Sequence, residues 1–471
     1  MMRKAGRFQA LRRQGLESLL AFQRTRLEDL VAHARQHSPF YRDLYRGLPE
    51  KGFRLEDLPV THKPLIMEHF DDVVTDRRLK KEEVRQFAED IANLGKPFRE
   101  EFVVTNTSGT TGLRGYVVQH LSEWETFFAL NSLRPAPIPA RPGNRKRLLA
   151  APFSGFRVAV VAGTGVNFIT PMAFLIMPPL LKRFSRVLLI STLLPVDEMV
   201  EKLNAFQPDR IHGYPTMLEA LAYRQLEGSL RIRPMDISTS SEPLTPRARR
   251  AIEQAFDVFV ENTYGATETW IMAKECPRGR MHLFVDGCIV EPVDAGGRAV
   301  RPGERSERIL VTNLFNFTQP AIRYEMQDSV IPLAEPCPCG SPLPTVGLIG
   351  REDDTLYCLS ADGAYVAFPP MSMESLMLEL KGYRMFQIRQ LERNRIRITF
   401  VPAPGEEPGQ VRQRILDHAA GYFASHGLGG VLVLEVEPVA EVERVQRSQK
   451  SKQIASLVGP PADLEGRLVY R

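Results

Sequence analysis

Residues 107–112 read Thr-Ser-Gly-Thr-Thr-Gly and directly follow a β-rich run that begins near Phe102. Glycines let the backbone turn tightly, and its N–H groups together with hydroxyls can surround an anion. The segment is no Walker loop, because Gly-Lys-Ser/Thr is missing, which argues against a kinase or GTPase. An ordinary polar turn is the alternative. The predicted phosphate-binding residues are Thr107, Ser108, Gly109, Thr110, Thr111 and Gly112.

A second candidate segment, residues 264–268, reads Tyr-Gly-Ala-Thr-Glu. A tyrosine can stack on a base, a threonine can bind a phosphate oxygen, and a carboxylate can hold Mg²⁺. By itself this pentapeptide is also typical of a strand end followed by a turn.

Three cysteines and one histidine could form a metal site. Cys337 and Cys339 stand one residue apart in a Cys-Pro-Cys-Gly turn, and Cys276 and His282 lie upstream. Together they would complete a tetrahedral structural zinc site, provided that the fold joins the two segments. Two unrelated surface turns with free thiols are the alternative.

The composition is that of a soluble multidomain protein. The chain has 471 residues, 43% hydrophobic and 25% charged, with a net charge of +5. This length predicts two or more domains, and so slight a charge does not indicate a nucleic-acid or membrane partner. Five cysteines, an odd number, indicate a reducing compartment, here the cytoplasm. A homodimer is left open.

The order of elements predicts an α/β fold. Short β-rich runs such as 102–105 and 147–150 alternate with helical patterns such as 196–206 and 216–227, which indicates a largely parallel sheet covered on both faces. After residue 350 the pattern changes to strands at 384–391, 395–401 and 430–436 and a helix at 410–424, typical of a separate α+β unit.

No targeting segment stands out, and one uncharged stretch is long enough to span a bilayer. Residues 1–22 scatter basic residues among apolar ones and predict an amphipathic helix rather than a signal peptide. Residues 158–181 carry no charge, but glycines and prolines interrupt them, so a buried strand, a turn and a core helix fit better than a membrane span.

The motifs together resemble the adenylate-forming enzymes, which include acyl-CoA synthetases and adenylation domains. Besides the segments at 107–112 and 264–268, three further motifs occur in the order expected for this family. They are Ser241-Glu242-Pro243-Leu244, Arg323-Tyr324 with Asp328, and Gly350-Arg351-Glu352-Asp353-Asp354. The segments at 37–42 and 336–340 are similar to the phenylacetate–CoA ligase branch, whose relatives also place Cys and His at similar points.

The resemblance implies a large core domain over residues 1–350, with doubly wound sheets and a distorted barrel, and a mobile C-terminal lid over residues 351–471. It also implies ATP and Mg²⁺: a carboxylate attacks the α-phosphate, giving an acyl-adenylate and pyrophosphate, and a nucleophile then displaces AMP. Implied roles are nucleotide binding for Ser241, Glu242, Pro243, Gly265, Asp328 and Arg351, stacking on adenine for Tyr264, an α-phosphate contact for Thr267, Mg²⁺ binding for Glu268 and a hinge at Asp353.

A lysine near the C-terminus bridges the attacking carboxylate and the α-phosphate in this family. Residues 448–452 read Ser-Gln-Lys-Ser-Lys and are similar to that segment, with Gln449 where a glycine is usual. Lys450 is therefore the predicted catalytic lysine, with Lys452 in reserve. As plain sequence, the segment is a solvated basic tail.

Acid and acceptor are less defined. Phe153, Gly213 and Tyr214 fall in segments where a substrate pocket is expected, and their character favours an aryl or apolar carboxylate, although Phe153 or Tyr214 could equally be core residues. The Arg-Gly pair that helps to admit CoA in the family that the chain resembles is missing after residue 358. CoA is the first acceptor considered, with an amine or a carrier-protein thiol as the alternative, and a catalytically silent nucleotide-binding protein as the alternative from another class.

Overall fold

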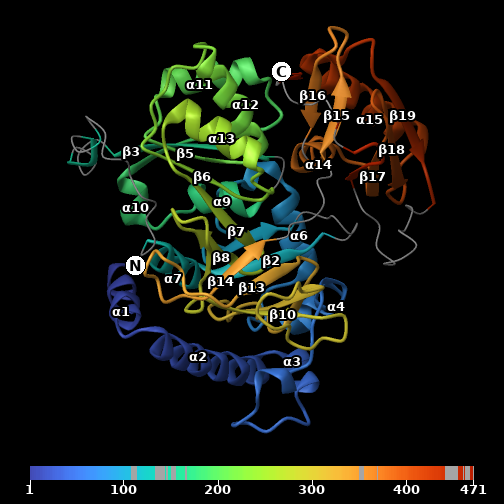
Figure 1. The fold of residues 1–471 in the computed structure, drawn as a ribbon. Helices are drawn as coiled ribbons and strands as arrows, with labels where there is room; N and C mark the ends of the chain where they lie inside the picture. Colours follow the sequence, from blue (N-terminus) through green and yellow to red (C-terminus); the bar gives the residue numbers. More distant parts are fainter. Residues whose placement is uncertain are drawn as a thin grey trace.

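The computed structural model describes residues 1–107, 114–132, 144, 147–149, 155–164, 167–348, 355–368, 370–440, 454–459, 461 and 467–469. Figure 1 shows a helical N-terminal layer at one end, a central region of sheets with helices above it, and a C-terminal unit beside those helices. The α/β class predicted from the sequence is confirmed.

The N-terminal layer consists of helices on the outside of the sheets (Figure 1). Ser38 and Pro39 start one of them, because the Ser38 hydroxyl accepts the Tyr41 N–H at 3.2 Å and proline fits the first turn. The helices are α1 (Met2–Arg13), α2 (Leu16–His37), α3 (Pro39–Leu44), α4 (Lys63–Glu68), α5 (Phe70–Val73) and α6 (Lys81–Glu89), with 3-10 turns at Leu55–Asp57 and Ile91–Asn93.

The largest sheet has the strand order β13-β14-β9-β8-β7-β6-β5-β3-β4 among the described residues. Strands β4, β3, β5, β6 and β7 run parallel, and the remaining pairs are antiparallel. Its strands are β3 (Phe156–Ala162), β4 (Ser185–Ser191), β5 (Arg210–Gly213), β6 (Asp236–Thr239), β7 (Val260–Ala266), β8 (Trp270–Glu275), β9 (Met281–Leu283), β13 (Val330–Leu333) and β14 (Thr345–Leu348).

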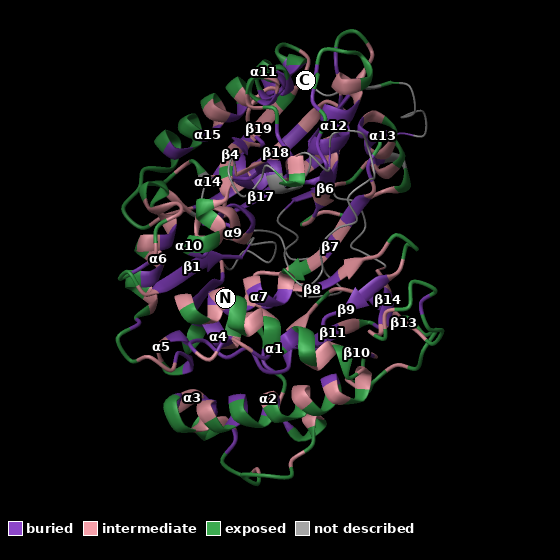
Figure 2. Cartoon of the chain, turned by 90° about the vertical axis from the view of Figure 1, so that its left-hand side faces the viewer, coloured by how far each residue is buried: buried purple, intermediate pink, exposed green. Residues whose placement is uncertain are grey.

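Helices cover the parallel half of this sheet. Figure 1 shows α11 (Val196–Phe206), α12 (Pro215–Leu226) and α13 (Pro246–Phe256) together on one side of strands β3, β5 and β6. The strands themselves are largely buried (Figure 2), as expected of parallel strands between two layers. Within the uncharged stretch at 158–181, β3 is followed by α9 (Ile169–Leu175), whose Met172 is buried, so the predicted strand and core helix are present. A second short helix, α10 (Pro179–Arg183), begins at the end of this stretch, and residues 165–166 of the predicted turn lie outside the described residues.

Two smaller sheets complete the core region. β1 (Phe102–Asn106) and β2 (Tyr116–His120) form an antiparallel pair, with α7 (Leu121–Asn131) after it. β10 (Cys288–Val293), β11 (Arg308–Asn313) and β12 (Tyr324–Met326) form an antiparallel sheet of three strands. One apolar cluster joins both sheets to the N-terminal helices, so that this layer and the sheets share a core.

The C-terminal unit is α+β. β17 (Tyr383–Glu392), β18 (Arg395–Pro402), β19 (Val433–Pro438) and β20 (Ile454–Ser456) form one sheet, with α15 (Pro408–Phe423) and a π-turn at Ala424–Leu428 beside it. β15 (Leu356–Leu359), β16 (Tyr365–Phe368) and β21 (Leu468–Val469) form another, and α14 (Pro370–Leu378) follows β16. These residues have their own apolar cluster. Tyr357 and Ala367 nevertheless pack into the cluster of the parallel sheet. The domain boundary near residue 350 stays a prediction.

Two local predictions were wrong. The N-terminal helix is not continuous over residues 1–22, because Gly15 adopts a φ of 92° and separates α1 from α2. Residues 147–149, predicted as part of a strand, are helical, since a short apolar run does not distinguish the two conformations.

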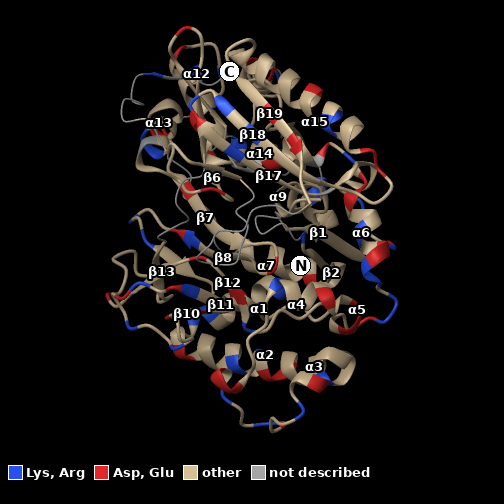
Figure 3. Cartoon of the chain, turned by 90° about the vertical axis from the view of Figure 1, so that its right-hand side faces the viewer, with Lys and Arg blue, Asp and Glu red and all other residues tan. Residues whose placement is uncertain are grey.

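In the view of Figure 3, basic and acidic residues both occur along α2 and α15. No helix in the described ranges is long and apolar enough to cross a membrane.

Candidate active site

The predicted phosphate loop lies between two paired strands. β1 ends at Asn106 and β2 begins at Tyr116. Thr107 closes the base of the loop, because its N–H donates to the Gly115 carbonyl at 2.9 Å and its hydroxyl accepts the Gly115 N–H at 2.9 Å. The predicted residues Ser108, Gly109, Thr110, Thr111 and Gly112 lie outside the described residues.

The Tyr-Gly-Ala-Thr-Glu segment turns the chain from β7 into β8. The two strands pair antiparallel with a register shift at Tyr264 and Gly265. A side chain at position 265 is sterically excluded, because a Cβ there would lie 1.9 Å from the Trp270 carbonyl oxygen. Gly265 therefore sets how closely β8 approaches, and with it where Thr267 and Glu268 stand.

The two motifs, far apart in sequence, meet in space. The Thr267 hydroxyl lies 3.5 Å from the carbonyl oxygen of Asn106, the residue before Thr107. Thr107 and Glu268 line one pocket, together with α4, β2 and the segment that leads into β12. The structure thus brings Thr107 of the predicted phosphate loop and Glu268, the residue predicted to hold Mg²⁺, to one small cavity.

Glu268 is held by two residues from outside its motif. Its Oε1 accepts a hydrogen bond from the Tyr324 hydroxyl at 2.8 Å, and its backbone carbonyl accepts one from the Asn313 amide at 2.9 Å. Burial and the adjacent Glu268 carboxylate raise the pKa of Tyr324 well above its usual value, so its hydroxyl stays protonated and able to donate.

The other nucleotide-side predictions lie after neighbouring strands. Ser241 follows β6 with a φ of 73°, and the Glu242 carboxylate accepts a 2.7 Å hydrogen bond from the Thr216 hydroxyl at the start of α12, with Pro243 next in the chain. Asp328 is half-buried between β12 and β13. Carboxyl ends of parallel strands are the usual ligand-binding edge of such sheets, which agrees with the position of Ser241 and Tyr264.

Two predicted pocket residues pack tightly at the end of β5. The Tyr214 side chain is buried in the core, and its hydroxyl accepts the Gly163 N–H at 3.1 Å. A Cβ at Gly213 would lie 3.0 Å from the Val161 carbonyl oxygen. Phe153, the third predicted residue, lies outside the described residues, so the acid pocket stays a prediction.

A partly buried imidazole adjoins this edge of the sheet. Its two ring nitrogens lie 2.8 Å from the Ser238 hydroxyl and 3.0 Å from the Ser240 hydroxyl. Burial, with a smaller contribution from Lys274, lowers the pKa of this residue, His212, to about 4. It is therefore neutral at physiological pH.

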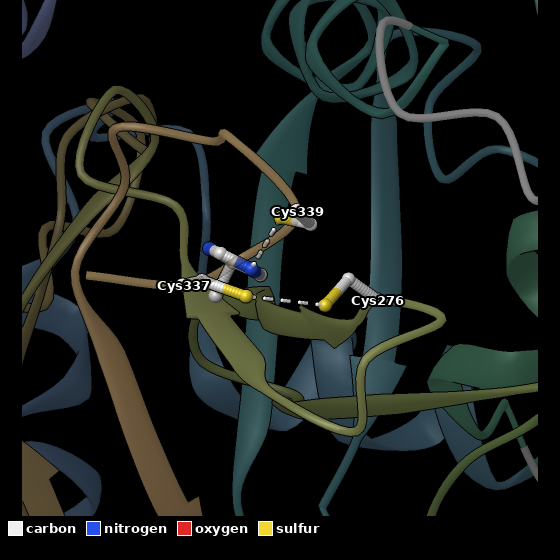
Figure 4. Close-up of side chains that lie close together, drawn as sticks. Cys276, Cys337 and Cys339 are labelled. Atoms are coloured by element: carbon white, nitrogen blue, oxygen red, sulfur yellow. Dashed lines mark hydrogen bonds between the residues drawn. The ribbon is translucent and has the colours of Figure 1, made fainter. Parts of the chain in front are cut away.

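The cysteine and histidine segments are brought together as the sequence predicted. Cys276 follows β8, His282 lies in β9, and Cys337 and Cys339 lie between β13 and β14 (Figure 4). The Cys276 and Cys337 sulfurs are 3.6 Å apart, and the Cys339 sulfur is 3.3 Å from His282 Nε2. All four ligand atoms lie within 4.8 Å of one another.

The geometry of this cluster suits a tetrahedral ion. Zinc at about 2.3 Å from sulfur and about 2.0 Å from nitrogen would separate neighbouring ligand atoms by about 3.5–3.8 Å. His282 Nδ1 lies 3.2 Å from the Leu343 carbonyl, so Nδ1 can carry the ring hydrogen and leave Nε2 as the ligand.

Four predicted residues cannot be placed in this site. Arg351, Asp353, Lys450 and the reserve Lys452 lie outside the described residues, and their roles stay predictions. Arg323, which belongs to the motif matched to the ribose segment, makes contacts that stabilise the fold. It forms an ion pair with Glu291 at 3.0 Å and donates a hydrogen bond to the Leu58 carbonyl at 2.8 Å.

The sequence matches Tyr324 only as part of a motif, and it does not identify Asn313 or Lys63 as site residues. The Lys63 ammonium donates to the Thr107 hydroxyl at 2.9 Å. No motif surrounds Lys63 in the sequence. Its contact with Thr107 joins residues far apart in the chain, and such a contact leaves no local sequence pattern.

Comparisons with known proteins identify the family of the chain. A sequence model described as AMP-binding enzyme matches residues 50–307. Protein CapK of Staphylococcus aureus is 29% identical over 133 residues, a segment that covers 28% of this chain and 28% of that protein.

Solved structures resemble the chain over most of its length. A 2-hydroxyisobutyryl-CoA ligase in complex with 2-HIB-AMP and CoA in the thioesterification state has a TM-score of 0.56 at 19% identity, over 93% of this chain and 89% of that one. An open conformation of such a ligase, with 2-HIB-AMP and CoA, has a TM-score of 0.51 at 18% identity, over 91% and 89%. At these low sequence identities, the structural similarity shows that the chain shares their fold.

Proposed function

Because the chain belongs to the AMP-binding enzyme family, within the adenylate-forming superfamily, we propose that it is an ATP-dependent, AMP-forming ligase of a carboxylic acid. The acid would attack the α-phosphate to give an acyl-adenylate and pyrophosphate, and the acyl group would pass to CoA with release of AMP. The observation that carries this proposal is the shared pocket of Thr107 and Glu268, two residues from motifs far apart in the sequence.

The residues present fit the groups that this reaction needs. Glu268 offers carboxylate oxygens, the ligand type that Mg²⁺ prefers, and Tyr324 fixes one of them. Thr107 would bind the terminal phosphates and Thr267 the α-phosphate. Tyr264 would stack on adenine, Asp328 and Arg351 would hold the ribose, and Lys450 would join the acid to the α-phosphate.

CoA is proposed as the acceptor, and the acid as aryl or apolar. Support for CoA is the fold shared with ligases whose structures contain CoA. Support for the acid is the aromatic and apolar character of the segments around Phe153 and Tyr214. The missing Arg-Gly pair after residue 358 favours the second candidate, an adenylating ligase that transfers to an amine or to a carrier-protein thiol.

We also propose that Cys276, His282, Cys337 and Cys339 bind a structural zinc ion. Four protein ligands close the coordination shell, which is the arrangement of a structural rather than a catalytic zinc. The ion would tie the turn after β8 to the loop before β14. Since β8 adjoins the Tyr264–Glu268 turn, zinc would support the active site from outside.

Acid-dependent exchange of labelled pyrophosphate into ATP tests the first half-reaction without knowledge of the acceptor. A panel of aryl and aliphatic acids should reveal exchange with one class, and CoA, simple amines and a carrier protein added in turn should then identify the acceptor by stimulated release of AMP. ATP binding without exchange for any acid would support a catalytically silent nucleotide-binding protein instead.

A further inference from the structure

Two sets of hydrogen bonds hold Lys63 beside the proposed nucleotide pocket: backbone bonds of the preceding residue Thr61, and a bond of the Lys63 side chain itself. Before it, the Thr61 N–H donates to the Arg323 carbonyl at 3.1 Å, and the Thr61 carbonyl accepts the Glu325 N–H at 2.8 Å. These bonds attach the chain next to Tyr324, the residue that holds Glu268. On the other side, the Lys63 ammonium reaches Thr107 at the base of the loop.

The hydrogen bonds of Thr107 orient its hydroxyl. The oxygen accepts from the Lys63 ammonium and from the Gly115 N–H, each at 2.9 Å. A hydroxyl has two acceptor positions and one hydrogen to donate. Because both acceptor positions are used, the hydrogen is directed away from these two donors and is available to an anionic oxygen.

The pocket needs a cation if it is to bind a polyphosphate. The described residues that line it include Glu268 but no basic side chain. The sequence from 105 to 113 contains no lysine or arginine, and Arg114 pairs with Glu89 at 3.3 Å. Lys63 is the first residue of α4, and Ile66 and Met67 of the same helix line the pocket.

We propose that Lys63 binds the β- and γ-phosphates of the nucleotide, and the pyrophosphate released from it, next to Thr107. This inference rests on the proposed function. A lysine ammonium is a compact charge, and its contact with the Thr107 hydroxyl brings that charge to the base of the loop, where it suits phosphate oxygens. The N-terminal helical layer would thereby supply part of the active site.

Calorimetric titration of the full chain with ATP, pyrophosphate and AMP tests this proposal. Lys63→Met keeps the aliphatic part of the side chain and removes the charge, so affinity for ATP and for pyrophosphate should fall by about 10- to 100-fold. Affinity for AMP, which lacks those phosphates, should stay within about twofold. Lys63→Arg should retain much of the affinity, and Lys51→Met, at an exposed position in the same layer, is the matched control.

A double-mutant cycle separates phosphate binding from support of Thr107. If Lys63 binds phosphate directly, Lys63→Met should weaken pyrophosphate binding further in a Thr107→Val background. No further loss there, or an equal loss of ATP and AMP affinity, would overturn the proposal.

The test also distinguishes the two proposals. Acid-dependent exchange in the wild type together with unchanged ATP affinity in Lys63→Met would refute the role of Lys63 alone. A wild type that binds neither ATP nor pyrophosphate would refute both.

Discussion

The Tyr324 hydroxyl donates a 2.8 Å hydrogen bond to the Glu268 carboxylate, and it joins β12 to the turn between β7 and β8. Each residue stands in a different predicted motif, so their contact connects the ribose segment to the adenine and Mg²⁺ segment. This hydrogen bond keeps one carboxylate oxygen engaged and fixes the orientation of the Glu268 side chain.

This contact predicts graded losses of adenylation. Glu268→Gln should reduce acid-dependent pyrophosphate exchange by about 100-fold or more, because the pocket loses its carboxylate. Tyr324→Phe should reduce it by about 10-fold, the effect of one hydrogen bond to a charged group. Exchange rates at saturating ATP measure both, with the exposed Glu304→Gln as control. Near-normal exchange in Glu268→Gln would contradict the role of this carboxylate.

Gly265 should tolerate no side chain. A Cβ would lie 1.9 Å from the Trp270 carbonyl oxygen, which is backbone and cannot turn aside. Gly265→Ala should lower the free energy of unfolding by about 2 kcal/mol and greatly reduce exchange. Urea denaturation measures the first effect. Gly47→Ala, where a Cβ would meet nothing within 4 Å, is the matched control. Equal stability of both variants would show that the close approach of β8 is unimportant.

The cysteine cluster should contain about one zinc ion per chain. Elemental analysis of protein purified without chelator measures the zinc content. Cys337→Ser should lose the metal and melt several degrees lower, while Cys288→Ser, at a buried cysteine outside the cluster, should keep it. A metal-free wild type that melts as high after addition of zinc as before would exclude the structural role.

Stability should fall in acid partly because of His212. Its pKa is about 4 in the folded chain and about 6.5 when unfolded, so between these values only the unfolded state takes up the proton. Lowering the pH from 7 to 4 should therefore cost up to about 3 kcal/mol from this residue. His212→Gln should show a shallower loss in urea denaturation at pH 7, 6 and 5. Parallel curves for the two proteins would show that His212 does not contribute.

Local sequence patterns predicted most of the fold. The helix at 196–206 coincides with α11, and the C-terminal strands at 384–391 and 395–401 fall within β17 and β18. Long periodic segments and glycine- or proline-bounded strands are set largely by neighbouring residues. The prediction missed the break at Gly15, because a single glycine can also lie within a helix.

For the site, the sequence by itself determined the residue types and their order: the hydroxyl-rich loop after Phe102, the Tyr264–Glu268 turn, and three cysteines with a histidine. Only the tertiary structure decided which of them meet. Cys276 joins Cys337, and Thr107 shares a pocket with Glu268, because the order of strands in the sheets brings distant segments together. Lys63 is the clearest example of a site residue that the sequence alone does not predict. Its contact with Thr107 depends on the packing of α4 against those sheets and produces no periodic pattern in the sequence.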